Sequence, residues 1–315
     1  MERPGEPGFP PPPAPAVEVC YRHPTVVTRV HCSRCERPIC PDCMIPAPVG
    51  HQCPECVGQA RREFRQGPGR RIAVRSITAT KVLLAIIIAM FVLEVVAAGP
   101  RALGQGAANG RLLSLGALQP YLIANGEFWR LFTPMFLHLG LFHILFNAWA
   151  LWVFGTMVER DFGTGRFLAI FFVSGFLASV TTYVLGPTNI VGVGASGAIF
   201  GVFGAFVEYN YRRRHLAMAA ANLRFAMTLI LINALLALAW GAIDWRAHLG
   251  GFVAGLAAGL VAEGVGDRRR STLVTVLGFV GLLGAGVVLV MWRTSAIRAL
   301  PEFDQAVRYF TSLAG

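Results

Sequence analysis

The segment GASGAIFGVFG, residues 194–204, decides how this chain folds, because it opens a short, glycine-rich apolar run that holds one serine. A second apolar run carries AHLGG at residues 247–251, so that one histidine lies close to its beginning. Ionisable side chains are costly in a bilayer and mark functional sites there. Ser196 and His248 therefore predict two membrane helices that bring a hydroxyl nucleophile beside its general base.

Composition places the chain among integral membrane proteins. Of its 315 residues, 55% are hydrophobic and only 14% are charged, a balance that is unusual for a soluble domain. The net charge is +11, but the basic residues gather in short blocks between apolar runs, and such blocks set orientation in a bilayer. Nucleic acid is therefore not the expected partner. The N-terminus is polar and proline-rich, so no cleavable signal peptide is expected.

Seven apolar runs are interpreted as transmembrane helices, because helices satisfy their own backbone hydrogen bonds in lipid. They occupy residues 82–98, 131–154, 167–186, 195–210, 224–241, 246–264 and 272–292. Residues 99–130 are too polar to span the membrane yet rich in apolar side chains, so we expect them to rest at the membrane interface. The predicted fold class is an all-α membrane protein.

Arginine blocks predict the orientation of these helices. Arginines are frequent at 59–75, 155–166, 212–214 and 268–270. With a cytoplasmic N-terminus and seven spans, all four stretches lie on the cytoplasmic side. Ser196 and His248 then lie about 5–10 Å below the outer surface, at about 1.5 Å per residue. Only Lys81 is a lysine, a codon-usage pattern that favours a GC-rich bacterial genome and hence a multi-pass protein of a bacterial cell membrane.

The second predicted span adds three polar side chains at its outer end, His138, His143 and Asn147. The last two are four residues apart and share one helix face. Each feature alone has an ordinary structural explanation: a membrane serine can bond the carbonyl one turn back, and glycines can be helix-packing positions. A proton relay or a metal site is another interpretation of the histidines. Their common depth favours one joint site.

Glycines accompany both the serine and the histidine. Gly197 and Gly201 on one helix, with Gly251 and Gly255 on the other, form two small-xxx-small faces. Such faces let two helix backbones approach closely. A serine and a histidine on different helices need this approach to reach hydrogen-bond distance.

These residues resemble the motifs of the rhomboid intramembrane serine proteases. The matching segments are Trp129-Arg130, His138-x4-His143-x3-Asn147, Glu159-x3-Gly163-x2-Arg166-Phe167, Gly194-Ala195-Ser196-Gly197 and Ala247-His248-x2-Gly251-x3-Gly255. They cover roughly residues 80–265 in the order of the family. The resemblance implies a rhomboid-like bundle of six transmembrane helices plus one extra C-terminal transmembrane helix.

The resemblance also implies a role for each residue. Ser196 would be the nucleophile and His248 the general base, in a dyad without a carboxylate. His143 and Asn147, with the backbone N–H of Ser196, would form the oxyanion hole, and His138 would support that side of the site. The Trp129-Arg130 pair would shape the interfacial loop. No cofactor is expected for catalysis.

Two neighbours of the dyad are interpreted separately. Phe200 lies one turn after Ser196, where some family members carry tyrosine, and its ring is expected to pack against the imidazole of His248. Asp244 lies four residues before His248. We expect this aspartate to cap the helix from the outer loop rather than to complete a triad. Serine still needs the adjacent base, because its hydroxyl is a weak nucleophile.

The predicted function is that of an intramembrane serine endopeptidase. It would cleave transmembrane segments of other membrane proteins near the outer face, through an acyl-enzyme intermediate. One alternative is a catalytically inactive relative that binds or chaperones membrane helices; the presence of both dyad residues and of the oxyanion pair argues against it. A proton-coupled transporter is less favoured, because no inverted repeat is visible and Glu94 is alone near a helix end.

A compact cysteine-rich segment precedes the membrane part. Its seven cysteines and one histidine form four regular pairs, which favours metal over disulfides. The pairs are Cys20-x2-His23, Cys32-x2-Cys35, Cys40-x2-Cys43 and Cys53-x2-Cys56. Eight ligands suffice for two tetrahedral, structural Zn²⁺ sites, and His51 is a rival ligand to Cys53 or Cys56. The segment resembles a B-box-type zinc finger, which implies that pairs one and three hold one ion and pairs two and four the other.

The chain is therefore divided into six segments. They are a disordered proline-rich lead-in (1–17), a B-box-like zinc module (18–58), an arginine-rich linker (59–80), the rhomboid core (81–265), a seventh transmembrane helix (266–292) and an amphipathic tail (293–315). The zinc module is too small for a substantial core, so metal would provide most of its folding energy. On the cytoplasmic side, we expect it to regulate the enzyme or to dock a protein partner. The tail is expected either to lie on the membrane or to pack on the core.

Overall fold

The computed structural model describes residues 18–47, 49–66, 78–99, 103, 110–239, 243–263 and 268–313. The chain divides into two compact units, residues 1–76 and 77–315. The predicted lead-in at 1–17 and most of the second half of the predicted linker lie outside the described residues.

The N-terminal unit is small and has little regular structure. Its elements are one 3-10 turn, η1 (Pro41–Cys43), two short antiparallel strands, β1 (Ile45–Pro46) and β2 (His51–Gln52), and the helix α1 (Pro54–Gln66). The buried core consists almost entirely of cysteines, together with Ile39. Helix α1 crosses the predicted boundary at residue 58 and continues to Gln66, with Gly58 inside the helix.

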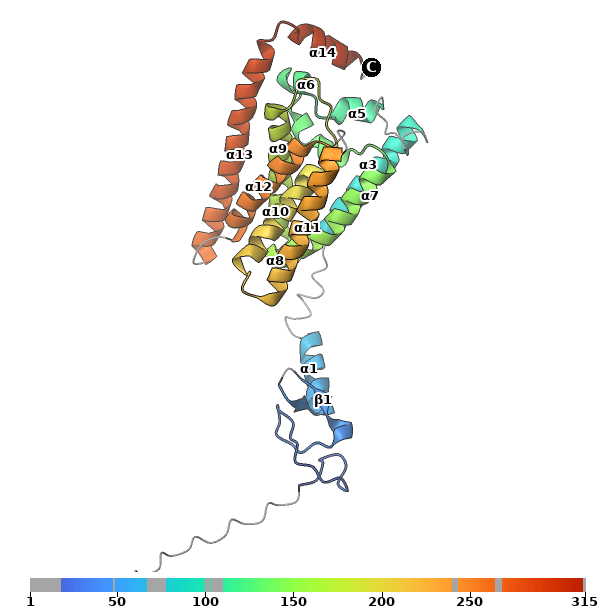
Figure 1. The fold of residues 1–315 in the computed structure, drawn as a ribbon, viewed down its shortest axis with the longest axis vertical. Coiled ribbons are helices and arrows are strands. Elements are labelled where there is room, and N and C mark those ends of the chain that lie inside the picture. The colour runs from blue at the N-terminus through green and yellow to red at the C-terminus, as the bar shows by residue number, and fades with distance from the viewer. Residues whose placement is uncertain are drawn as a thin grey trace, which may run out of the picture. The chain divides into compact units, whose positions relative to one another are not determined.

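The second unit is helical. Its elements are α3 (Thr78–Ala98), α5 (Arg111–Gly116), α6 (Pro120–Ala124), η2 (Phe128–Leu131), η3 (Thr133–Phe136), α7 (Leu141–Ala150), the π-helical turn η4 (Leu151–Gly155), α8 (Thr156–Phe162), α9 (Thr164–Leu185), α10 (Ser196–Arg212), α11 (Ala217–Ala239), α12 (Trp245–Glu263), α13 (Arg268–Arg298) and α14 (Phe303–Ser312). The long helices run side by side as a bundle, and α14 folds over one end of it near α6 (Figure 1).

Five of the described helical stretches are long and apolar enough to cross a membrane. They are Ala79–Ala98, Leu141–Phe162, Thr164–Leu185, Ala217–Leu236 and Thr272–Arg298. The prediction of an all-α, multi-pass membrane protein is therefore confirmed. Helices α10 and α12, of 17 and 19 residues and rich in glycine, fall outside this set. The number of spans, seven, stays a prediction.

The second span differs most from its prediction. A helix over 131–154 was expected, but residues 128–136 form short 3-10 turns and the helix begins at Leu141. Pro134 and Gly140, which has a φ of 82°, interrupt the apolar run. His138 therefore precedes the helix instead of lying on it. The predicted loop at 155–166 is also wrong, because it is helical except at Gly163, where a φ of 82° turns the chain.

The C-terminal elements extend beyond their predicted limits. Helix α13 continues to Arg298, six residues past the expected end at 292, because no proline or glycine interrupts residues 293–298. The predicted amphipathic segment forms α14, and its apolar side packs on the core beside Tyr121. The core-packing alternative for the tail is therefore confirmed.

Helices α10 and α12 are in backbone contact along their glycine faces. A Cβ added to Gly251 would collide with the carbonyl oxygen of Gly197, and one added to Gly255 would collide with that of Gly201. The two small-residue faces predicted from the sequence thus pack on each other, as close helix packing in membranes requires.

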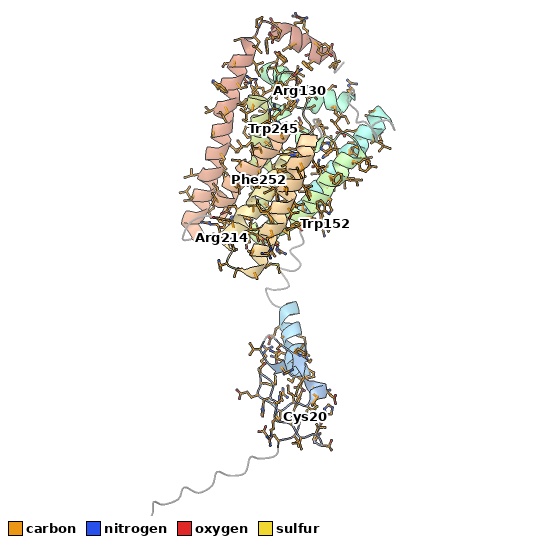
Figure 2. All side chains as sticks on the ribbon, viewed as in Figure 1. Cys20, Arg130, Trp152, Arg214, Trp245 and Phe252 are labelled. Carbon is orange, nitrogen blue, oxygen red and sulfur yellow. The ribbon has the colours of Figure 1, made fainter. Side chains whose placement is uncertain are left out.

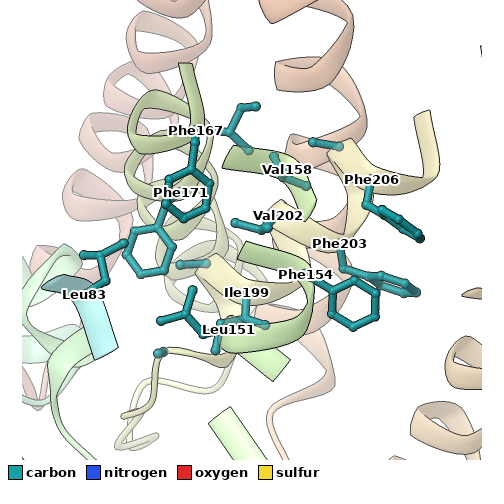
Figure 3. Packing of buried hydrophobic residues seen from close by; sticks show 14 of the residues in the cluster. Leu83, Leu151, Phe154, Val158, Phe167, Phe171, Ile199, Val202, Phe203 and Phe206 are labelled. Atoms are coloured by element: carbon teal, nitrogen blue, oxygen red, sulfur yellow. The ribbon is translucent and has the colours of Figure 1, made fainter. Parts of the chain in front are cut away.

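The core of the bundle is filled by large apolar side chains. Phe154, from η4, packs its ring against Phe203 and Phe206 of α10, with centroids 4.7 and 5.4 Å away. Phe167 and Phe171 of α9 are fully buried in the same cluster, which Figure 3 shows from close by. This cluster fixes α9 and α10 relative to the second span and so supports the end of the bundle where Ser196 and His248 lie.

Glu159 joins the second span to the first. Its Oε1 accepts hydrogen bonds from Ala79 N and Thr164 Oγ1, at 3.1 and 2.9 Å, and its Oε2 from Thr80 N and Thr80 Oγ1, at 2.9 and 2.7 Å. A carboxylate on the free N–H groups of a helix N-terminus is favourable. Glu159 thus caps α3 from another helix.

Candidate active site

Ser196 and His248 lie at the beginnings of two helices whose backbones touch. Ser196 is the first residue of α10, and His248 lies in the first turn of α12. Next to the serine, a Cβ built on Gly197 would be 3.6 Å from the carbonyl oxygen of Ala247. The structure therefore brings both predicted residues into one region, from segments about fifty positions apart in sequence.

The ring of Phe200 lies against the imidazole of His248. The two ring centroids are 4.2 Å apart and the planes are inclined by only 14°. Phe200 follows Ser196 by one helical turn, so the stack also fixes where the imidazole stands relative to the serine-bearing turn. The predicted packing of this ring on the histidine is confirmed.

His143 and Asn147 face the segment that leads into Ser196. A Cβ on Gly194 would lie 2.6 Å from His143 Nε2 and 3.7 Å from Asn147 Nδ2. Gly194 also has a φ of 122°, which side chains rarely adopt. His143 Nδ1 accepts a hydrogen bond from Leu139 N at 3.3 Å, so Nε2 carries the proton of the neutral ring.

The amide of Asn147 is a second free donor beside Gly194. Within the described residues its Nδ2 is buried and has no hydrogen-bond partner. Buried donors are rarely left unpaired unless a ligand, a water or a reaction intermediate completes them. Asn147 and His143 thus present two N–H groups to one small volume next to Ser196.

His138 supports the same segment from outside the helix. Its Nε2 accepts a hydrogen bond from Ala195 N, the residue before the serine, at 3.5 Å. Its ring meets that of His143 edge to face, with centroids 5.2 Å apart. Both carboxylate oxygens of Glu94 accept from the backbone N–H of His138 at 3.2 Å. His138 and Glu94 are both buried.

Glu94 was not predicted as part of this site. The sequence showed an acidic residue alone near the end of an apolar run, and the structure pairs it with a backbone N–H 44 positions away. An isolated carboxylate in a membrane span is a signal of a buried polar partner. That rule singles out Glu94 in the sequence, but only the fold shows that its partner is the backbone N–H of His138.

Asp244 caps α12. Its Oδ1 accepts from the backbone N–H groups of Arg246 and Ala247, at 3.1 and 3.4 Å, and its Oδ2 from Thr182 Oγ1 at 2.5 Å. The predicted capping role is therefore confirmed. The bond to Thr182, which was not predicted, ties the beginning of α12 to α9.

Arg130 organises the interfacial segment. Its buried guanidinium donates to the carbonyl oxygens of Ala117 and Ser114, at 2.8 and 2.7 Å, and to Glu127 Oε2 at 2.7 Å. Figure 2 shows Arg130 toward the same end of the bundle as Trp245 of α12, with Arg214 toward the opposite end. Arg130 thus holds the loop around the site, because its guanidinium donates to two backbone carbonyl oxygens of the preceding segment.

The N-terminal unit holds two groups of side chains that are able to bind a metal ion. They are Cys20, His23, Cys40 and Cys43, and Cys32, Cys35, Cys53 and Cys56, and within each group the ligand atoms lie within 4.8 Å of one another. Pairs one and three therefore come together, as do pairs two and four. Among the described residues, His51 joins neither group.

The chemistry of the two groups fits a cation. Burial raises the pKa of the Cys20 thiol, but backbone N–H donors, that of Arg22 foremost, lower it to about 6 overall. Burial raises the pKa of Cys56 to about 12, and the neighbouring cysteine sulfurs add to this rise. Crowded thiols of this kind become stable thiolates when a metal ion supplies the positive charge.

Comparison with known proteins gives one consistent result. A family model described as the rhomboid domain matches residues 125–263. The rhomboid protease GluP of Bacillus subtilis (strain 168) is 38% identical over 206 residues, which are 63% of this chain and 40% of that protein. A second relative in that bacterium, YdcA, is 37% identical over 147 residues, 47% of this chain and 73% of that protein.

A eukaryotic relative is also similar to this chain, at lower identity. Rhomboid-like protease 1 of Toxoplasma gondii is 32% identical over 154 residues, 48% of this chain and 52% of that protein. The matched rhomboid domain contains Ser196, His248, His138, His143 and Asn147, whereas Glu94, the cysteine-rich unit and helices α13 and α14 lie outside it. The chain covers only part of the length of these relatives, 40% in the case of GluP.

Proposed function

This chain belongs to the rhomboid family, and from that premise we propose that it is an intramembrane serine endopeptidase. The observation that supports the proposal is the backbone contact between α10 and α12, the helices that carry Ser196 and His248, together with the buried Nδ2 of Asn147, which has no hydrogen-bond partner among the described residues. Such a combination has the parts that acyl transfer needs: a nucleophile, a base and an oxyanion site.

The reaction would proceed through an acyl-enzyme. His248 takes the proton of Ser196 while the serine oxygen attacks the scissile carbonyl. The resulting oxyanion accepts hydrogen bonds from His143 Nε2, from Asn147 Nδ2 and from the N–H of Ser196. This last N–H is free, because the first residues of a helix have no partner within it, and the helix N-terminus favours the negative charge.

Collapse of the tetrahedral intermediate would break the peptide bond. His248 returns the proton to the leaving amine, and the acyl group stays on Ser196 as an ester. Water then attacks this ester with His248 again as the base, and the free serine and the new carboxyl terminus result. All steps use side chains of this chain, and no cofactor takes part in the proposed catalysis.

The substrate would be a transmembrane helix of another protein. Intact helices keep their carbonyls in hydrogen bonds, so cleavage requires a segment that unwinds easily, such as one with glycine or proline near the scissile bond. The arginine blocks favour a cytoplasmic N-terminus and a site near the outer face. The near absence of lysine, with Lys81 alone, supports assignment to a bacterial cell membrane.

We also propose that the N-terminal unit binds two Zn²⁺ ions. One would be held by Cys20, His23, Cys40 and Cys43 and the other by the four remaining cysteines, each as a closed tetrahedral site that supports folding. The position of this unit before the first span, on the cytoplasmic side, favours a docking or regulatory role. It supplies no group to the proposed reaction.

Reconstitution with a model transmembrane substrate tests the activity. Cleavage by the wild type, together with its loss in Ser196→Ala and His248→Ala, supports the endopeptidase. Labelling of the wild type but not of Ser196→Ala by a fluorophosphonate would show an activated hydroxyl. A wild-type protein that neither cleaves nor labels would favour the inactive relative that binds membrane helices.

A further inference from the structure

The C-terminal end of the chain forms an arm outside the matched rhomboid domain. We define the arm as residues 293–312, the last turns of α13 together with α14. With 31 residues, α13 is about 46 Å long at about 1.5 Å per residue, whereas the hydrocarbon core of a bilayer is about 30 Å thick. Its far end therefore extends past the membrane core, and α14 folds back over the bundle beside α6 (Figure 1).

The arm grips α6 by polar and aromatic contacts. Arg298 Nε donates to the carbonyl oxygen of Ala124 at 2.6 Å, and Tyr121 donates its hydroxyl to Glu302 Oε1 at 3.1 Å. The ring of Tyr121 also lies 6.4 and 6.2 Å from those of Phe303 and Phe310, centroid to centroid. Tyr121 itself is buried.

The hydroxyl of Tyr121 has a second partner on the other side. It accepts a hydrogen bond from Thr188 Oγ1 at 3.1 Å, in the loop between α9 and α10. The carbonyl oxygen of Thr188 accepts in turn from Gln119 Nε2 at 3.1 Å. One phenol oxygen therefore connects the arm with the loop that ends at Ser196.

The rest of that loop is bonded to the interfacial segment as far as the serine. Leu118 and Gly192 exchange two backbone hydrogen bonds, of 2.9 and 3.0 Å, and Gly194 N donates to Pro134 O at 2.8 Å. At the other end of the loop, Arg293 of the arm donates to the carbonyl oxygens of Tyr183 and Gly186, at 3.3 and 3.4 Å. The arm thus holds the loop at its beginning and, through α6, along its length.

We propose that the arm is a positioning element for the loop 186–195, and that Tyr121 is the joint through which it acts on Ser196. The expected effect on kcat rests on the proposed protease function, whereas the holding of the loop by the arm does not. A purely stabilising arm would need only the apolar contacts of α14. The hydroxyl of Tyr121 bonds both the carboxylate of Glu302 in the arm and the hydroxyl of Thr188 in the loop. It therefore also fixes the position of the loop relative to the arm.

The test compares two tyrosines in the full-length, reconstituted protein. Tyr121→Phe removes the joint and keeps the ring, whereas Tyr309→Phe makes the same change at an exposed position of α14. We expect Tyr121→Phe to lower kcat and the fluorophosphonate labelling rate about 3- to 10-fold, the factor of one ordinary hydrogen bond. KM should stay unchanged and the melting midpoint should fall by no more than a few degrees, Tyr309→Phe should match wild type, and Glu302→Gln, which keeps an acceptor, should retain most of the rate.

A second readout works even if the protein is not a protease. Amide hydrogen exchange of residues 186–195 should be faster in Tyr121→Phe than in wild type or Tyr309→Phe, because local opening becomes easier. If the wild type is not labelled by the fluorophosphonate but the exchange difference is seen, the protease function is refuted while the role of Tyr121 in holding the loop is supported. Unchanged exchange in Tyr121→Phe, or an active variant with wild-type kcat, would overturn the joint.

Discussion

Phe200 lies flat on the imidazole of His248, with ring planes inclined by 14°. The phenyl ring restricts the imidazole on one face, and such aromatic pairs contribute about 0.5–1.5 kcal/mol beyond burial. We expect Phe200→Leu to lower kcat about 2- to 10-fold, while Phe200→Tyr keeps the wild-type rate. Cleavage at saturating substrate measures both. Equal rates for Phe200→Leu and wild type would show that the stack does not orient the base.

The hydrogen bond between Thr182 and Asp244 should affect kcat as a coupled pair, so that losing either partner has the effect of losing both. Thr182→Val and Asp244→Ala each untie the beginning of α12 from α9, so the double variant should lose no more than the worse single variant. Thr181→Val is the matched control, since among the described residues the hydroxyl of Thr181 donates within its own helix, to Leu177 O at 2.8 Å. Additive losses in kcat would refute the coupling.

His143 and Asn147 should act on the transition state. Loss of one oxyanion donor in soluble serine proteases lowers kcat about 10²- to 10³-fold. We expect His143→Ala and Asn147→Ala to lower kcat by similar factors at nearly constant KM. Each should also slow fluorophosphonate labelling, since the reagent develops an oxyanion of its own. A change in KM alone would assign these residues to substrate binding instead.

Close packing of α10 on α12 predicts a severe effect of one methyl group. A Cβ at position 255 has no space beside Gly201 O, whereas one at Gly284 of α13 meets nothing within 4 Å. Overpacking typically lowers stability by about 1–3 kcal/mol. We expect Gly255→Ala to lower the melting midpoint and to reduce labelling of Ser196, and Gly284→Ala to match wild type. Equal midpoints for the two variants would contradict the packing.

Zinc removal should unfold the N-terminal unit. A fragment of residues 18–66 should bind two zinc ions and lose its circular dichroism with a chelator, because metal provides most of the folding energy of so small a domain. Acidification should have the same effect, since protonated thiols do not bind zinc. Cys53→Ala should bind one ion and His51→Ala two. A chelator-resistant spectrum would exclude structural zinc.

Much of the membrane unit follows from local sequence. Glycine spacing predicted the contact of α10 with α12, and the position of Phe200 one turn after Ser196 predicted its stack on the histidine. The beginning of the second span was not predicted, because hydropathy alone does not separate the 3-10 turns before Gly140 from a helix. A positive φ and one proline decide that boundary, and both act through backbone geometry.

Long-range polar pairs were also beyond sequence reasoning. Glu94 with His138 N, Thr182 with Asp244, and Tyr121 with Thr188 and Glu302 each join segments far apart in the chain. Each partner has an ordinary structural explanation by itself. Only the relative placement of α3, α9 and the C-terminal arm, which depends on packing of the whole bundle, shows which group meets which.

The cap that Glu159 forms on α3 has a mechanical consequence for the cysteine-rich unit. The polypeptide enters the bundle at Ala79 and Thr80, where one carboxylate holds two main-chain amides and a hydroxyl. A force applied to the chain upstream of α3 would therefore load these hydrogen bonds first. They would have to break before the first turn of α3 could separate from Glu159.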